Sequence, residues 1–551
     1  MCGIWALFQK NTSCLSNDVF YKYFKNIQSR GPDRSLYFEL NNPINIKLGF
    51  HRLSIMDTTT KGDQPFKFEE NDRTVYLICN GEVYNHRELC QTHDLKPHSG
   101  SDCEVILLLY KKYGNMELIS KELTGEYAFL ICDINTRTGD YKVYSCNDRF
   151  GVRPLFVLEN RDYILFSSEL KGFPLKELYD YNVKRHPPRH ISEFTKLKNE
   201  FSSIKYTEYY NLLLLKQTIF DLDEAKTKIR ESFEMAVESM IESDREIGCL
   251  LSGGLDSSLV SSCASRVLKR CGRKLKTFSI GLPGSTDEKY ANLVSEYIDS
   301  DHTHILVSEE DFLKVVPDVI RMIESYDITT VRASTGQYLI SKWISENTNI
   351  KVLLGGDGSD ELLNGYLYCH KAPSQEEMYK ENVRILNDIH LYDGLRADRC
   401  IAGHGIEARF PFLNHKFVET VFSIDMKYRM PTEGLEKWLI RQAFNSGEYL
   451  PIDVISRVKC AFSDGCSDIK RSWYNILQEN IENLYTDKDI IIAQTKYKHL
   501  TPYTKESLYM RDIYSNIYGE NAAEILEYYW LPKWCGDVKD PSARKLDFYK
   551  E

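Results

Sequence analysis

The chain has 551 residues and a formal net charge of −10, with 70 lysines and arginines against 80 aspartates and glutamates. This balance provides no broad basic surface, so we expect no nucleic-acid partner. Hydrophobic residues make up 42% of the chain, and no run approaches the roughly eighteen apolar residues of a membrane span. The fifteen cysteines lack zinc-type pairing, and the first residues show no signal-peptide pattern. We therefore expect a cytoplasmic protein of about two to four domains, with reduced thiols and no membrane contact.

An apolar run at residues 3–8 predicts a buried strand at the start of the chain. Removal of Met1 would make Cys2 the amino terminus, so that the thiol and the free α-amine would belong to one residue. The amine has an ordinary pKa of about 7.7–8.0 and could accept the thiol proton. Taken alone, Cys2 could equally be a small buried cysteine.

A series of short polar motifs follows Cys2 in a fixed order. They are 29–33 (SRGPD), 51–57 (HRLSIMD), 80–85 (NGEVYN), 100–104 (GSDCE), 123–129 (LTGEYAF), 148–155 (DRFGVRPL) and 167–171 (SSELK). Each charged residue alone would more often be a solvated surface group. In this order, however, the motifs resemble the N-terminal-nucleophile glutamine amidotransferase domain.

That resemblance implies a site that hydrolyses glutamine. Cys2 would be the nucleophile, and the Asn80 side-chain amide and the Gly81 backbone N–H would donate to the developing oxyanion. Arg52 offers a planar cation for the glutamine carboxylate. Asp102, with Glu82 beside it, would hold the ammonium group. The other residues expected at the glutamine site are Leu53, Ser54, Ile55 and Met56.

Segments that are apolar or alternate in polarity predict strands at 3–8, 75–79, 127–132, 141–145 and 163–167, and residues 104–110 predict a helix. The resemblance implies an Ntn hydrolase-like α+β fold, an αββα sandwich of antiparallel sheets. We assign this glutaminase domain to residues 2–190. Residues 191–220 are polar with little periodicity, and we expect a linker with connecting strands there.

Residues 247–258 (IGCLLSGGLDSS) combine an apolar run, a glycine turn and the start of a helical pattern. This order directs backbone N–H groups and the positive end of a helix dipole at one place, which suits phosphate. Asp256 would repel a bare phosphate, so it indicates a divalent cation between the two. The stretch resembles the pyrophosphate-binding loop of ATP pyrophosphatases and lacks the Walker spacing. A plain tight turn with a Ser/Asp cap is the alternative.

Strand-like and helix-like segments alternate from about residue 221 onward. Strands are predicted at 276–280, 304–307 and 351–354, and helices at 287–298, 308–323 and 336–346. This alternation predicts an α/β domain with a doubly wound parallel sheet, whose ligands bind at the carboxyl ends of strands. The last of these strands runs directly into a second glycine turn, 355–361 (GGDGSDE), where that rule places a ligand.

The two glycine turns, together with 329–335 (TTVRAST), 407–413 (EARFPFL), 457–459 (RVK) and 462–465 (FSDG), resemble the synthetase domain of the glutamine-hydrolysing asparagine synthetase family. The resemblance extends from Cys2 to about residue 470. We assign this HUP-like ATP pyrophosphatase domain to residues 221–551. The residues implied in ATP binding are Leu251, Ser252, Gly253, Gly254, Asp256, Ser257, Ile280, Gly355 and Gly356.

The same resemblance implies Mg²⁺ on Asp256 and Asp360. Thr329 and Arg332 would handle aspartate and the α-phosphate, and Asp357 would act in forming the acyl-adenylate and accepting ammonia. Lys459 would neutralise charge on the transferring phosphate oxygens. A homodimer is expected from the resemblance alone.

Four positions depart from the family pattern. Asp357 stands where the family usually has glutamate, and Gly355 where it usually has serine. Asn414 replaces an aspartate and Arg189 replaces a glycine. The first departure shortens a site carboxylate by one methylene, and the second removes a hydroxyl donor.

The expected reaction has two halves. Cys2 releases ammonia from glutamine, while ATP converts aspartate into β-aspartyl-AMP and pyrophosphate; ammonia then displaces AMP to give asparagine. Two alternatives stay open: a relative that adenylates another carboxylate, including a lactam-former, and a weakened homologue with a binding role. Cys2 opposes the lactam-former, which needs no ammonia, and residues 329–335 favour aspartate.

Overall fold

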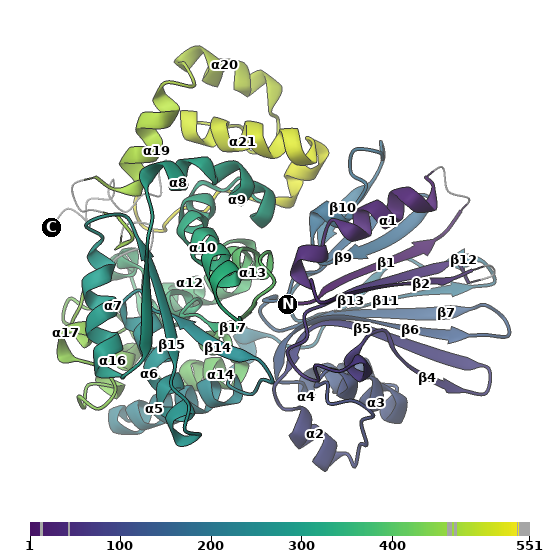
Figure 1. The fold of residues 1–551 in the computed structure, drawn as a ribbon, viewed down its shortest axis with the longest axis horizontal. Helices are drawn as coiled ribbons and strands as arrows, with labels where there is room; N and C mark the ends of the chain where they lie inside the picture. Colours follow the sequence, from purple (N-terminus) through teal and green to yellow (C-terminus); the bar gives the residue numbers. More distant parts are fainter. Residues whose placement is uncertain (12–14, 42–43, 460–464, 468–470, 537, 539–551) are drawn as a thin grey trace. The chain divides into compact units, whose positions relative to one another are not determined.

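The computed structural model describes residues 1–11, 15–41, 44–459, 465–467, 471–536 and 538 (Figure 1). The chain divides into two compact units. The first contains Met1–Asn211, Ser243–Arg245 and Ala402–Glu407. The second contains Leu212–Glu242, Glu246–Ile401 and the chain from Ala408 onward.

The first unit contains two sheets in which every neighbouring pair of strands is antiparallel. One sheet has the order β10 (Asn182–Arg185), β8 (Phe156–Glu159), β9 (Tyr163–Ser167), β1 (Gly3–Gln9), β3 (Ile46–Arg52), β2 (Arg34–Leu40). The other has the order β12 (Glu200–Phe201), β11 (His190–Leu197), β7 (Tyr141–Asn147), β6 (Gly125–Asn135), β5 (Arg73–Val83), β4 (Phe66–Glu70), with β13 (Lys205–Glu208) also paired to β11.

Successive side chains of a strand point to opposite faces of its sheet, and the first unit has two separate hydrophobic cores. Ile4 and Phe8 of β1 face Leu130 of β6 in the core between the sheets. The opposite face of the second sheet packs against the helices α2 (His86–Thr92), α3 (Glu104–Tyr113) and α4 (Met116–Glu122). On the first sheet, Trp5 packs against Phe24 of α1 (Asn17–Lys25). The predicted αββα sandwich is therefore confirmed.

Residues 190–208 contain connecting strands that pair with the second sheet. β11 pairs with β7 from Ile191↔Cys146 to Lys196↔Tyr141, and β13 pairs with β11. Ile191 joins the core under the helices, whereas Phe194 joins the core between the sheets. The connecting strands expected within residues 191–220 include β11, whose period was hidden in the sequence by the polar residues between these apolar contacts.

The second unit contains a five-stranded sheet of order β16 (Asp301–Leu306), β15 (Lys276–Gly281), β14 (Glu246–Leu250), β17 (Ile350–Leu354), β18 (Glu407–Arg409). The first four strands are parallel, which confirms the predicted α/β sheet. Along the chain, β15 and β16 are added on one side of β14, and β17 is then added on its other side. Ligands of such sheets bind where the strand order reverses, here between the carboxyl ends of β14 and β17.

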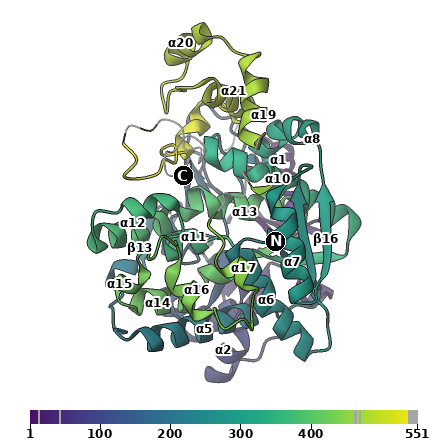
Figure 2. The same ribbon diagram turned by 90° about the vertical axis from the view of Figure 1, so that its left-hand side faces the viewer.

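Some helices of the second unit pack against this sheet, and others, such as α20 and α21, lie farther from it at the top of Figure 2. Their bounds are α5 (Leu222–Ser239), α6 (Leu255–Arg270), α7 (Thr286–Tyr297), α8 (Glu309–Lys314), α9 (Val316–Ile323), α10 (Ile328–Asn347), α11 (Ser359–Leu363), α12 (Gln375–Asp388), α13 (Asp393–Ala402), α14 (His415–Ser423), α15 (Met426–Arg429), α16 (Trp438–Ala443), α17 (Ile452–Ile455), α19 (Trp473–Glu482), α20 (Asp487–Lys496) and α21 (Lys505–Tyr518). No helix of the described chain has both the length and the apolar content needed to cross a membrane.

Two predicted helices have different bounds in the structure. The segment 308–323 forms two helices, because Pro317 starts a new helix, α9, after the break at Val315. The helix predicted at 336–346 begins earlier, at Ile328, where the Asp327 side chain accepts the Thr330 N–H and caps it. This extension places the predicted site residues Thr329 and Arg332 in the first turns of α10.

The departures at Arg189 and Asn414 have different structural consequences. Arg189 has a φ of 56°, in the left-handed region where a glycine is less strained. Asn414 caps α14, and its side chain accepts the backbone N–H groups of Lys416 and Phe417. Asparagine and aspartate cap helices about equally well, so the second departure preserves the local fold.

Candidate active sites

Cys2 directly precedes β1 in the first unit, partly buried against the core between the sheets. Its thiol donates a weak hydrogen bond to the Leu53 carbonyl at 3.7 Å. Arg30 Nε donates to the Cys2 carbonyl at 3.0 Å, and Arg30 Nη1 lies 2.9 Å from Glu169 Oε1. Because Arg30 and Glu169 are fully buried, this ion pair fixes the backbone of the residue that carries the thiol.

Burial changes the protonation of both groups at the start of the chain. It raises the pKa of the Cys2 thiol to about 11, so little thiolate forms near neutral pH without a base. It lowers the pKa of the Met1 amine to about 6, so that amine is mostly neutral there. Removal of Met1 stays a prediction; it would place the amine on Cys2 itself.

Asn80 lies in β5, which packs against β1. Its side chain is fully buried, and neither its Nδ2 nor its Oδ1 has a hydrogen-bond partner among the described residues. Buried amides are nearly always hydrogen-bonded, so this one is available to a ligand. At the next position, Gly81 has a φ of 145°, and a Cβ there would lie 2.1 Å from the Glu126 carbonyl. Only glycine fits this position.

The two charged residues expected to bind glutamine have partners within the protein. Arg52 Nη1 lies 2.8 Å from Asp63 Oδ1, and Arg52 Nη2 donates to the Asp57 carbonyl. Asp102 Oδ2 accepts the Val83 N–H at 2.6 Å. A glutamine carboxylate would therefore have to share Arg52 with Asp63. The other expected residues of this site are buried (Leu53, Ser54, Ile55, Glu82) or half-buried (Met56).

In the second unit, the first glycine turn follows β14, and Gly254 is the N-cap residue of α6. Gly253 has a φ of 73°, and a Cβ there would lie 2.4 Å from a backbone nitrogen of α7. The hydroxyl groups of Ser252 and Ser257 are 3.0 Å apart. The loop thus brings two hydroxyls and a helix N-terminus together, an arrangement that binds phosphate.

The second glycine turn follows β17 and touches the first. Ser359 Oγ donates to Asp256 Oδ1 at 2.7 Å. A Cβ at Gly356 would lie 2.9 Å from the Asp256 Cβ and 2.9 Å from the Ser257 nitrogen, so glycine permits the close approach of the two loops. Both predicted nucleotide loops therefore meet at the reversal point of the sheet.

The departures at Gly355 and Asp357 fit each other. A Cβ at residue 355 would lie 2.9 Å from Asp357 Oδ2 and 3.2 Å from Phe410 Cε1. Asp357 Oδ1 lies 3.0 Å from Arg396 Nη2, and burial raises the pKa of the Asp357 carboxyl group. A serine at 355 would crowd this carboxylate, so the shorter acid and the missing side chain form a matched pair.

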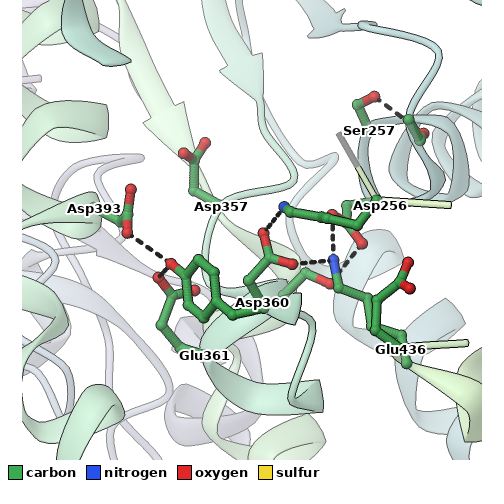
Figure 3. Close-up of polar contacts among 12 residues, drawn as sticks. Asp256, Ser257, Asp357, Asp360, Glu361, Asp393 and Glu436 are labelled. Atoms are coloured by element: carbon green, nitrogen blue, oxygen red, sulfur yellow. Dashed lines mark hydrogen bonds and ion pairs between the residues drawn. The ribbon is translucent and has the colours of Figure 1, made fainter. Parts of the chain in front are cut away.

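A lysine that the sequence analysis did not single out lies between the two expected Mg²⁺ ligands. Lys437 Nζ is 2.5 Å from Asp256 Oδ2 and 2.6 Å from Asp360 Oδ1, and Lys459 pairs with the other oxygen of Asp360. Figure 3 shows Asp256 and Asp360 converging, with Asp357 turned away from them. Burial raises the pKa of Asp360, but Lys437 and Lys459 outweigh it and hold that pKa below its usual range.

Two convergent carboxylates fit Mg²⁺, which prefers oxygen ligands and keeps several waters or substrate phosphate oxygens. The described residues contain no group of three or more His, Cys, Asp or Glu side chains that could hold a metal. Mg²⁺ at Asp256 and Asp360 would therefore take its remaining ligands from the substrate and from water.

A second cluster of carboxyl groups lies on the other side of Asp357 (Figure 3). The Tyr366 hydroxyl lies 2.7 Å from Glu361 Oε1 and 2.9 Å from Asp393 Oδ2. Burial and the neighbouring Asp393 raise the pKa of Glu361 well above its usual value. Arg396 Nε lies 2.7 Å from Asp393 Oδ1, so one arginine links this cluster to Asp357.

The carboxylates Asp256, Asp357 and Asp360, the Glu361–Asp393 cluster and both lysines line one cavity. Leu251 and Ile280 are buried and give it an apolar wall. Thr329 and Arg332 enter it from α10, and the buried Thr329 hydroxyl has no partner among the described residues. Tyr474 also lines the cavity, and it comes from the C-terminal part of the chain, for which the sequence analysis predicted no role.

Lys437 lies outside the motifs of the sequence analysis, and its contact with a glycine becomes visible only in the structure. A Cβ at Gly365 would lie 2.0 Å from the Lys437 Cε, so the glycine leaves room for the lysine stem. Arg396 shows no comparable local pattern. Of the expected FSDG motif, residues 462–464 lie outside the described residues, whereas a Cβ at Gly465 would lie 2.3 Å from Asp287 Oδ2.

Residues 1–228 match the profile of the glutamine amidotransferase domain, and residues 228–386 and 372–534 match that of asparagine synthase. Fold and sites thus define a glutamine amidotransferase fused to a synthetase. The chain is 40% identical to the glutamine-hydrolysing asparagine synthetase of Cricetulus griseus and 39% identical to those of Mus musculus and Homo sapiens. Each alignment covers all of this chain and 99% of the relative. The chain therefore belongs to the asparagine synthetase family.

Proposed function

We propose that this protein makes L-asparagine from L-aspartate and ATP, with nitrogen taken from L-glutamine. The observation that carries the proposal is the contact of the two glycine loops through Ser359 and Asp256, at the reversal point of a parallel sheet. That contact places a phosphate-binding turn against the carboxylates Asp256 and Asp360. The chain also carries the half-buried Cys2 directly before β1, and a thiol there supports a glutamine-hydrolysing unit.

In the glutaminase half, the Cys2 sulfur attacks the amide carbon of glutamine and ammonia leaves. The α-amine of a processed Cys2 takes the thiol proton, and the unpartnered Asn80 amide, with the Gly81 N–H, stabilises the oxyanion. One donor of this kind supplies roughly 2.7–4 kcal/mol of the barrier reduction. Water then hydrolyses the glutamyl thioester. Arg52 and Asp102 bind the carboxylate and the ammonium of the substrate.

In the synthetase half, the β-carboxylate of aspartate attacks the α-phosphorus of ATP, and pyrophosphate leaves. Ser252–Ser257 hold the leaving pyrophosphate, with adenine between Leu251 and Ile280 and the nucleotide against Gly355 and Gly356. Asp256 and Asp360 would hold Mg²⁺, which when bound neutralises phosphate charge. Lys437 and Lys459 lie close enough to these carboxylates to add positive charge at the same place.

Ammonia completes the reaction by attacking the β-carbonyl of β-aspartyl-AMP, and AMP leaves. The attacking nitrogen must lose a proton, and Asp357, held by Arg396, is the carboxylate we assign to that step. Thr329 and Arg332 bind aspartate and the α-phosphate. Free ammonia is mostly protonated in neutral water, so we expect the nitrogen to travel shielded from solvent.

We further propose a cytoplasmic location, a homodimer, and a glutaminase domain that extends through β13 rather than ending at residue 190. The alternative of a weakened homologue was based on the departures at Gly355 and Asp357. It is less supported now, because these two residues accommodate each other. The test is incubation of the purified protein with aspartate, ATP, Mg²⁺ and glutamine. Asparagine and AMP in equal amounts support the proposal. AMP formed only with another carboxylate, or no AMP at all, contradicts it.

A further inference from the structure

The C-terminal helices reach the synthetase cavity through a buried ion pair. Arg332 Nε lies 2.7 Å from Glu506 Oε1, and Arg332 Nη2 donates to the other oxygen of the same carboxylate. The face of the Tyr474 ring lies 4.7 Å from the guanidinium carbon. Glu506 belongs to α21, which packs against α9 and α10. A helix without a recognised motif thus forms an ion pair with a residue of the proposed substrate site.

Glu506 is itself held in place. Its side chain is 2% exposed, against 6% for Arg332, and Gln478 Nε2 of α19 donates to its Oε2 at 2.5 Å. It lies in the first turn of α21, where the helix dipole favours a negative charge. A bidentate carboxylate fixed in this way determines the direction of a guanidinium plane.

The cavity also contains competitors for Arg332. Asp357, Asp360, Glu361 and Asp393 line the same cavity, whereas Glu506 is not among its lining residues. An arginine without a partner behind it would turn toward one of these carboxylates, because a buried unpaired charge is costly. It would then be lost to the substrate.

We propose that Glu506 is a positioning residue for the synthetase reaction: it holds Arg332 away from the acidic groups of the cavity and directs it toward the substrate carboxylate and the α-phosphate. The inference rests on the proposed role of Arg332. It gives the C-terminal helices α19 and α21 a function in catalysis, as the support of an arginine that they do not themselves contain.

The test compares Glu506→Gln with Glu482→Gln, measuring pyrophosphate release at varied aspartate. Glu482 is 70% exposed and pairs with Lys505, the residue before Glu506, so its variant is a matched control. For Glu506→Gln we expect kcat/KM for aspartate to fall about tenfold or more, mainly through KM, with partial recovery in Glu506→Asp. Glu482→Gln and glutamine hydrolysis stay unchanged.

A double-mutant cycle separates positioning from a merely structural role. In an Arg332→Ala background, Glu506→Gln should have no further effect on kcat/KM. An equal loss in both backgrounds, or an unchanged kcat/KM in Glu506→Gln, would overturn the inference. If Glu506→Gln does not fold, Gln478→Ala, which loosens Glu506 and keeps its charge, must raise the aspartate KM; an unchanged KM overturns the inference.

The same assay distinguishes failure of this inference from failure of the proposed function. If the unsubstituted protein forms no AMP from aspartate, the proposed function fails before any variant is compared. If it adenylates another carboxylate, the same ratios are measured with that substrate. The inference then stands or falls on whether the effect of Glu506→Gln disappears when Arg332 is absent.

Discussion

Cys2 combines a half-buried side chain, whose thiol pKa is raised by burial to about 11, with a backbone carbonyl fixed by Arg30 at 3.0 Å. A thiol of this kind is a poor nucleophile until its proton is removed. The nearby Asn80 amide lacks a partner among the described residues. The proposed glutaminase site therefore has an unpartnered amide for a ligand and needs a base for its thiol.

Replacement of the thiol tests the nucleophile directly. We expect Cys2→Ala to lower glutamine-dependent asparagine formation by about 10⁴-fold or more, while synthesis from added ammonium continues. Cys271→Ala is the matched control, because Cys271 is exposed and outside both sites. Asparagine formation from glutamine in Cys2→Ala would show that the thiol is not the nucleophile.

If the terminal amine is the base, kcat/KM for glutamine must depend on pH. The terminal amine accepts the thiol proton only when neutral, and burial lowers the pKa of the Met1 amine at this terminus to about 6. We expect kcat/KM for glutamine to be highest above the pKa of the processed amine and to fall as the pH drops through it. The measurement is a pH profile of glutamate release. A rate that rises as the pH falls would contradict the assignment.

The proposed synthetase site is built from two glycine turns that touch. Gly253 needs a positive φ, and Gly356 permits the approach of the loops, whereas a Cβ at Gly254 would meet only Ser252 Oγ, at 3.4 Å. The strands β14 and β17 carry these turns to one point because they are neighbours in the sheet.

We expect alanine at Gly253 and at Gly254 to change the free energy of unfolding by different amounts. We expect Gly253→Ala to lower the free energy of unfolding by about 1–3 kcal/mol, because alanine is strained at positive φ and its Cβ would clash. Gly254→Ala should cost less, at most about 1 kcal/mol, because its φ of −74° is ordinary and only the poorer capping by alanine counts against it. Urea denaturation measures both. Equal losses would contradict the geometry of the turn.

Sequence patterns predicted the site residues that lie in contiguous motifs. Cys2, Asn80 and the turn around Asp256 each lie in a contiguous motif, and the alternation of strand and helix indicated the parallel sheet. Lys437, Arg396 and Glu506 were not predicted, because they reach the site only through tertiary packing. The bounds of β11 could not be predicted for a related reason: this strand is stabilised by pairing with β7, not by its own apolar pattern.

At the scale of the whole molecule, each compact unit contains the residues of one proposed half-reaction. The groups around Cys2 belong to the first unit, and the groups around Asp256 belong to the second. A single substitution should therefore remove one half-reaction and preserve the other.

Asp256→Ala makes that prediction for the synthetase half. It removes a carboxylate bound to Ser359 and Lys437, so we expect AMP formation to fall at least about 10²-fold while glutamine hydrolysis continues. Release of glutamate and of AMP are measured in parallel. Loss of both activities together would indicate a folding defect instead of a chemical role.

The most direct test identifies the nucleotide that the protein forms from ATP in the presence of aspartate, Mg²⁺ and amide-¹⁵N-labelled glutamine. A protein that adenylates aspartate on the two glycine loops and captures nitrogen released by Cys2 forms AMP and amide-labelled asparagine in equal amounts. ADP in place of AMP, or asparagine without the label, would contradict it.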